Sequence, residues 1–186
     1  MRYIWVLTGG IDFVTAGVSL TVIDIAQQAH ATPFAIGLIF GVASLAGVLP
    51  ASIGPWLRKR YSFVRIVLVS LWALLLFWPA FALASNSVLL GVVLTLVITA
   101  SITYDLAQFS YRLQLIPDNL QGRINSIYRL LVFGVQPLGI ALTGFLLQAL
   151  GPTPTVLAFF LPLIVLVLLA TFNPHLRAGS TASEQS

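Results

Sequence analysis

The sequence predicts an all-α membrane protein with six transmembrane helices. Of its 186 residues, 59% are apolar and only 8% are charged, and the mean hydropathy is +1.01. This leaves too little polar surface to cover a soluble domain of that size. Six apolar stretches follow one another, each close to the roughly 20 residues that cross a bilayer as a helix. The connections between them alternate between uncharged and basic.

The six stretches make up one predicted domain, residues 1–174. The first is too long for the apolar core of a cleavable signal peptide and carries Asp12 in its interior, so we expect it to span the membrane. The second is rich in small residues, which let neighbouring helices approach closely. The polar residues 175–186 are expected to form a disordered cytoplasmic tail. The predicted spans are 3–25, 34–57, 63–83, 88–109, 124–150 and 155–172.

The basic residues all fall on one side of the predicted membrane. The positive-inside rule then places both termini in the cytoplasm and the chain in the plasma (cytoplasmic) membrane as a multi-pass protein. Because topology explains the net charge of +4, we expect no nucleic-acid partner. The nine basic residues are Arg2, Arg58, Lys59, Arg60, Arg65, Arg112, Arg123, Arg129 and Arg177.

The composition gives little support to an enzyme or a metal site. There is no cysteine, and two histidines and one methionine do not form a cluster of soft ligands. No phosphate-binding loop, zinc spacing or nucleophile elbow is present. We therefore expect no metal, no cofactor and no catalytic residues.

Asp12 is the first residue that could carry function inside the membrane. A carboxylate near mid-depth costs about 2.5–3.5 kcal/mol on insertion scales, so it should face a cavity or a partner. Two interpretations are open. Asp12 either titrates protons or recognises a cation, or it is a hydrogen-bonded aspartate packed against another helix beside Gly9 and Gly10.

A second polar group lies toward the cytoplasmic end of the fourth span. Asp105 and Gln108 are three residues apart, which predicts one shared helical face, with Tyr104 beside them. They form part of a cavity wall, or Asp105 pairs with a basic residue near the membrane surface. The predicted substrate or proton pathway consists of Asp12, Tyr104, Asp105, Gln108 and Gln136.

Two basic connections and one helix are candidates for gating. The turn between spans two and three, GPWLRKRYSFVR, contains Gly54 and Arg58, whose alternative role is membrane anchoring with phospholipid contact. In the next basic connection, Pro117 and Asp118 predict a tight reversal, and Gly122 and Arg123 come just before the fifth span. Pro137 and Gly139 then predict a helix that can bend and pack closely.

The stretch 115–144 carries a family resemblance. Its Pro117-Asp118, Gly122-Arg123, NSIYRLL and QPLG segments resemble the cytoplasmic loop and eleventh transmembrane helix of major facilitator transporters. The branch it resembles is the drug and macrolide efflux branch, which includes enterobactin exporters. Gly54 followed by basic residues is similar to the loop of that family, although Arg58 stands where an acidic residue is expected.

The span count fits this resemblance. Six spans divide into two three-helix units, and the second must be inverted because the first ends on the opposite side; such inverted repeats build each half of the major facilitator fold. The resemblance implies proton-coupled efflux of a small amphipathic substrate, such as a macrolide, drug or siderophore. It also implies a second six-helix half, either a second copy or a separately encoded N-terminal half. A non-transporting interaction protein or an inactive fragment stays open.

Overall fold

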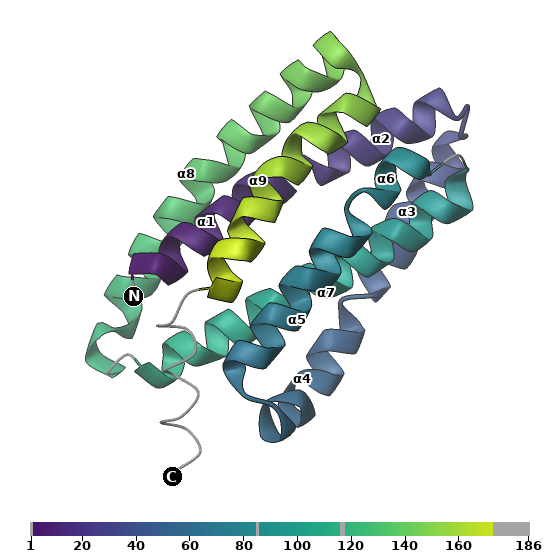
Figure 1. Cartoon of the computed structure of the whole chain (residues 1–186). Coiled ribbons are helices and arrows are strands. Elements are labelled where there is room, and N and C mark those ends of the chain that lie inside the picture. The colour runs from purple at the N-terminus through teal and green to yellow at the C-terminus, as the bar shows by residue number, and fades with distance from the viewer. Residues whose placement is uncertain (1, 85, 116–117, 173–186) are drawn as a thin grey trace.

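The computed structural model describes residues 2–84, 86–115 and 118–172, so Pro117 and the predicted tail lie outside the described residues. Within those ranges the chain folds into helices without strands (Figure 1). The helices are α1 (Arg2–Thr15), α2 (Val18–Gln28), α3 (Pro33–Leu45), α4 (Val48–Arg60), α5 (Phe63–Phe77), α6 (Ala80–Leu83), α7 (Ser87–Leu115), α8 (Asp118–Leu150) and α9 (Pro152–Phe172).

Six helical stretches in the described part of the chain are long and apolar enough to cross a bilayer. The first three each consist of two consecutive helices, whereas α7, α8 and α9 are continuous. The predicted fold class, an all-α membrane protein with six spans, is confirmed. In order, spans 1 to 6 are Leu7–Gln28, Pro33–Arg60, Phe63–Leu83, Ser87–Tyr111, Asn125–Leu150 and Pro152–Phe172.

Each of the first three spans is interrupted near its middle or its end. Span 1 changes helix at Ala16 and Gly17, and span 3 at Trp78 and Pro79. In span 2, the amide of Gly47 donates to the oxygen of Ser44 at 3.3 Å, a three-residue spacing typical of a tighter helical turn. The sequence did not predict these interruptions.

The packing of the spans has an internal symmetry. Span 1 (α1, α2) packs against spans 5 and 6, and span 4 (α7) packs in the same way against spans 2 and 3. Spans 3 and 6 also contact each other. If spans 1, 2 and 3 are exchanged with spans 4, 5 and 6, respectively, the pattern of contacts between spans is therefore unchanged. Because each unit has an odd number of spans, the two units run through the bundle in opposite directions, which is the arrangement expected of inverted repeats.

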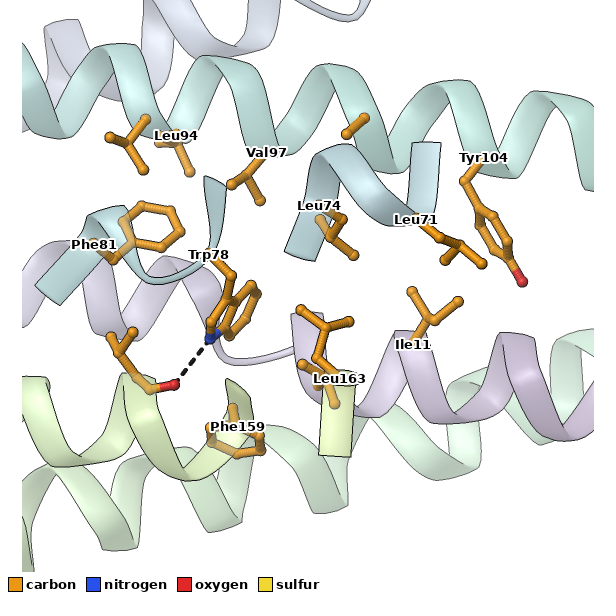
Figure 2. Close-up of a cluster of buried hydrophobic side chains, with 14 of the residues drawn as sticks. Ile11, Leu71, Leu74, Trp78, Phe81, Leu94, Val97, Tyr104, Phe159 and Leu163 are labelled. Atoms are coloured by element: carbon orange, nitrogen blue, oxygen red, sulfur yellow. Dashed lines mark hydrogen bonds between the residues drawn. The ribbon is translucent and has the colours of Figure 1, made fainter. Parts of the chain in front are cut away.

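The apolar core lies between α1, α5, α7 and α9 (Figure 2). Trp78 is only 3% exposed, and its indole Nε1 donates to the carbonyl oxygen of Val156 at 3.0 Å. This bond ties the end of span 3 to span 6 and satisfies the one polar group of the ring. Besides Trp78 and Tyr104, the labelled side chains of this core are Ile11, Leu71, Leu74, Phe81, Leu94, Val97, Phe159 and Leu163.

The basic residues of the described part of the chain gather at one end of the bundle. The start of α1, the α4–α5 turn, the end of α7 and the start of α8 all lie at this end, which we call the basic end (Figure 1). The described turns at the other end contain no lysine or arginine. This asymmetry has the form that the positive-inside rule requires. The cytoplasmic orientation of the basic end stays a prediction.

Two predicted turns are shorter than expected. Asp118 was predicted in the reversal before span 5, but its backbone begins α8. Likewise, Gly54 and Arg58 belong to α4, and only Tyr61 and Ser62 separate α4 from α5.

Candidate functional site

A polar cluster joins α1 to α7 inside the bundle. Thr8 Oγ1 lies 3.1 Å from the hydroxyl oxygen of Tyr104, and Gln108 Nε2 donates to that same oxygen at 2.7 Å. All three side chains are 2% exposed. We call Thr8, Tyr104 and Gln108 the polar cluster. It links span 1 with span 4, the two spans that the internal symmetry exchanges.

Helical spacing explains how the cluster extends toward Asp12. Tyr104 and Gln108 are four residues apart on α7, and Thr8 and Asp12 are four apart on α1, so each pair shares one helical face. Asp12 is half-buried. It lies ten residues into α1, about 15 Å from the start of the helix at 1.5 Å per residue, or roughly half the thickness of the hydrocarbon core. Polar groups therefore follow one another from Gln108 near the basic end to Asp12 at mid-depth.

Gln108 has an acceptor that the cluster does not use. Its Oε1 atom is buried and accepts no hydrogen bond from the described residues. Because buried polar atoms are almost always hydrogen-bonded in folded proteins, this oxygen can receive a donor from a bound molecule or from water. The adjacent Tyr104 hydroxyl can both donate and accept.

Asp105 does not join this cluster. Its side chain is exposed, whereas Gln108 on the same helix is buried. The two side chains therefore differ in burial, and the prediction that Asp105 and Gln108 line one polar cavity stays a prediction. A three-residue step separates two side chains by about 60° around a helix of 3.6 residues per turn, which is enough to turn one inward and the other outward.

Gln136 lies at the depth of the cluster on a third helix. Gly139 of α8 packs against the carbonyl of Phe13, and Thr143 packs against Gly17, so α1 and α8 run side by side in a fixed register. Gln136, one turn before Gly139, is consequently level with Gly9 and Gly10, between Thr8 and Asp12. Its side chain is half-buried.

The predicted bend residues of α8 have different positions. Pro137 is exposed, and α8 continues through it without interruption. Gly139 is buried at the crossing with α1, where an added Cβ would lie 3.0 Å from Ala16 Cβ and would collide with the carbonyl of Phe13. The close approach of α1 and α8 therefore requires this glycine.

The remaining loop candidates lie at the basic end, away from the polar cluster. Arg58 Nε donates to the oxygen of Gly54 at 3.2 Å, and its Nη1 donates to Ser110 Oγ, which ties α4 to α7. Gly122 and Arg123 are exposed in the first turns of α8. The backbone of Asp118 begins the same helix.

Thr8 is the member of the site that sequence reasoning missed. A lone threonine in an apolar span is ordinary, and its hydroxyl usually bonds to its own helix, as in Thr95, Thr99 and Thr103. The available signal was its position four residues before Asp12. Among the described residues, no group of three or more histidine, aspartate, glutamate or cysteine side chains could hold a metal ion.

Comparison with known proteins gives a partial match. Over 68 residues the chain is 38% identical to the multidrug efflux pump Tap of Mycolicibacterium fortuitum. The aligned stretch makes up 37% of this chain and 17% of that pump, so the chain covers far less than two thirds of this relative. No protein-family model matches the chain, and no solved structure matches it.

Proposed function

We propose that this chain is a domain of a membrane transporter that exports a small amphipathic molecule in exchange for protons. Six helices that could cross a bilayer and the similarity to a multidrug efflux pump support a transporter in general. The resemblance to the drug and macrolide branch of the major facilitator transporters adds the direction and the substrate class, such as a macrolide, drug or siderophore.

The observation that carries the proposal is the row of polar groups between α1 and α7. It runs from Gln108 through Tyr104 and Thr8 toward Asp12, inside a bundle whose other buried residues are mostly apolar. Intramembrane ionisable groups are costly and are typical of ion and substrate pathways. A purely structural bundle would pack more simply with apolar side chains at these positions.

In this proposal Asp12 gains and releases the proton. The hydroxyls of Thr8 and Tyr104 each can donate and accept a hydrogen bond, so the polar cluster can relay a proton between Asp12 and the basic end. An ionised Asp12 favours cationic substrates. Gln136, at the same depth on α8, is proposed to contact the substrate. Asp105, which is exposed on α7, is proposed to face the second half of the transporter.

A second six-helix half completes the proposed pathway. One six-helix unit offers one wall, and alternating access needs another unit to rock against. Spans 2 and 5, which the internal symmetry exchanges, are also the two least buried spans. Their exposed apolar side chains give a second copy, or a separately encoded half, a surface to pack against. Those exposed by more than half include Leu45, Leu49, Trp56, Leu130, Phe133, Leu138 and Phe145.

The proposed location is the plasma membrane, with the basic end and both termini in the cytoplasm. The gathering of arginine and lysine at one end of the bundle supports this orientation. In the same scheme the α4–α5 turn and the start of α8, with Gly54, Arg58, Gly122 and Arg123, form the cytoplasmic side of the gate. Pro137 and Gly139 belong to the helix that moves.

Transport by purified protein in liposomes tests the proposal. Export of the lipophilic cation ethidium is followed by fluorescence under an imposed pH gradient, with the chain alone and with a candidate partner half. We expect gradient-driven export that Asp12→Asn abolishes. The matched control is Asp24→Asn, in the same span, where Asp24 accepts a hydrogen bond from Gln28 near the end opposite the basic end.

Two results would count against the proposal. Gradient-driven export that survives Asp12→Asn would remove the proton role of Asp12. Absence of export in both reconstitutions, with the helical fold retained by circular dichroism, would favour a non-transporting interaction protein.

A further inference from the structure

Two adjoining apolar grooves lie at the basic end, between α4, α5 and α7. One has a volume of about 260 Å³ and the other about 390 Å³, and they share Leu57, Ile66 and Thr103 in their walls. Both are open on one side. We call the pair the basic groove. It is separate from the polar cluster, although Gly54 and Arg58 in its wall also belong to the proposed cytoplasmic side of the gate.

The rim of the groove is cationic. Among the described residues that line it, the charged ones are Arg58 and Arg65, at the end of α4 and the start of α5. The sequence has no acidic residue between Asp24 and Asp105. The contacts described for these arginines are Gly54 and Ser110 for Arg58 and the Tyr61 ring for Arg65. The two guanidinium groups therefore form a positive site beside an apolar groove.

Hydrogen bonds leave both arginines able to bind an anion. Arg58 uses two of its five N–H donors, on Gly54 and Ser110. Arg65 lies over the ring of Tyr61, 5.9 Å from its centroid, which holds the guanidinium at the rim. Guanidinium groups match phosphate oxygens with paired hydrogen bonds.

The depth of the groove fits a lipid. Arg58 and Arg65 lie at the ends of spans 2 and 3, where headgroups lie, while the walls below them belong to the apolar interiors of spans 2 and 4. We propose that the basic groove binds one anionic phospholipid. Its phosphate lies between Arg58 and Arg65, and one acyl chain follows the wall formed by Leu57 and Thr103.

Charge argues against a second copy of this chain covering the rim of the groove, even where the apolar faces of spans 2 and 5 pack against one. A copy in the same orientation brings its own basic end to the same depth, so like charges would meet at the rim. Another apolar groove, apart from the basic groove, shows what such a surface looks like without charge. It has a volume of about 490 Å³ and lies between α3 and α7, toward the end opposite the basic end. No charged side chain lines it among the described residues.

Native mass spectrometry of the purified chain tests the proposal directly, because binding is measured without transport. Phosphatidylglycerol and phosphatidylcholine with identical acyl chains are compared. We expect phosphatidylglycerol to bind with one-to-one stoichiometry at least tenfold more tightly. Replacing both Arg58 and Arg65 by Gln should weaken it at least about thirtyfold, because each guanidinium loses a charge-assisted hydrogen bond to the phosphate, worth roughly tenfold in affinity.

Matched controls separate a built site from diffuse attraction. Lys59→Gln and Arg60→Gln remove two charges from the same turn without touching the groove wall, and together should weaken binding less than threefold. Equal losses in the two double variants would overturn the proposal, as would equal affinity for the two lipids. Circular dichroism checks that every variant keeps its helices.

A second pair of variants tests the acyl chain. Gly54→Leu fills the groove with little strain, because the nearest atom to an added Cβ is Leu106 Cδ1 at 4.0 Å. It should weaken phosphatidylglycerol binding about tenfold, whereas Gly91→Leu in the uncharged groove should leave it unchanged. Inorganic phosphate at millimolar concentration should not displace the lipid. Displacement by phosphate, with Gly54→Leu binding as the wild type, would identify a phosphate site and overturn the lipid proposal.

Discussion

The side-chain oxygen of Thr8 lies 3.1 Å from the hydroxyl oxygen of Tyr104, joining two residues 96 positions apart in the chain. This contact crosses the boundary between the two three-span units. It bridges α1 and α7 inside the bundle, and Gln108 adds a second hydrogen bond to the same hydroxyl. The polar cluster therefore joins the two three-span units by hydrogen bonds, and it places hydroxyl and amide groups between them.

Removing the Tyr104 hydroxyl should destabilise the bundle. Tyr104→Phe leaves the buried Thr8 and Gln108 without a shared partner, and hydrogen bonds inside membrane bundles are worth about 0.6–2 kcal/mol. We expect a loss of about 1 kcal/mol in the free energy of unfolding, measured in detergent with increasing denaturant. Tyr111→Phe is the control, because Tyr111 stacks on Phe63 with centroids 4.0 Å apart and the variant keeps this ring contact. Equal effects of the two changes would show that the hydroxyl of Tyr104 has no special role.

The α1–α8 crossing should be sensitive to a single methyl group. In Gly139→Ala the new Cβ collides with the carbonyl of Phe13, and overpacking of this kind costs about 1–3 kcal/mol. Gly144→Ala, on the same helix with no atom within 4 Å of an added Cβ, should be neutral or stabilising, because alanine favours helix over glycine. Thermal unfolding followed by circular dichroism distinguishes them. A stable Gly139→Ala variant would mean that the two helices do not approach as described.

Composition and chain order were enough to predict the spans, because the bilayer imposes a length and a polarity on every segment that crosses it. Composition and chain order were not enough to predict which polar side chains form the candidate site. Whether Asp105 or Gln108 points inward depends on how α7 is rotated against α5, and the sequence of α7 alone does not fix that rotation. The contact of Thr8 with Tyr104 could be recognised only once α1 and α7 were placed in the bundle. Gly139 was predicted from the sequence as a position of close packing, but the group that it packs against, the carbonyl of Phe13, lies on another helix.

The two tryptophans of span 3 should respond differently to substitution. Trp78→Phe removes the hydrogen bond to the Val156 carbonyl and leaves a gap in the core, which should lower the free energy of unfolding by about 2–3 kcal/mol. Trp72→Phe should cost less than about 0.5 kcal/mol, because Trp72 is 47% exposed. Denaturant titrations of both variants in one detergent provide the measurement, and similar midpoints would argue against the interior position of Trp78.

The orientation of the bundle can be tested with the chain as it stands, because the protein contains no cysteine and each single-cysteine variant reports one position. Gly122→Cys lies near the basic end and Thr153→Cys near the opposite end, and both positions are exposed. If the basic end is cytoplasmic, a membrane-impermeant maleimide should label Thr153→Cys in intact cells. Gly122→Cys should react only after permeabilisation. If instead Gly122→Cys is labelled in intact cells and Thr153→Cys is not, the basic end lies outside, against the positive-inside rule. The rim of the basic groove would then lie in the outer leaflet, away from the anionic lipids of the cytoplasmic surface.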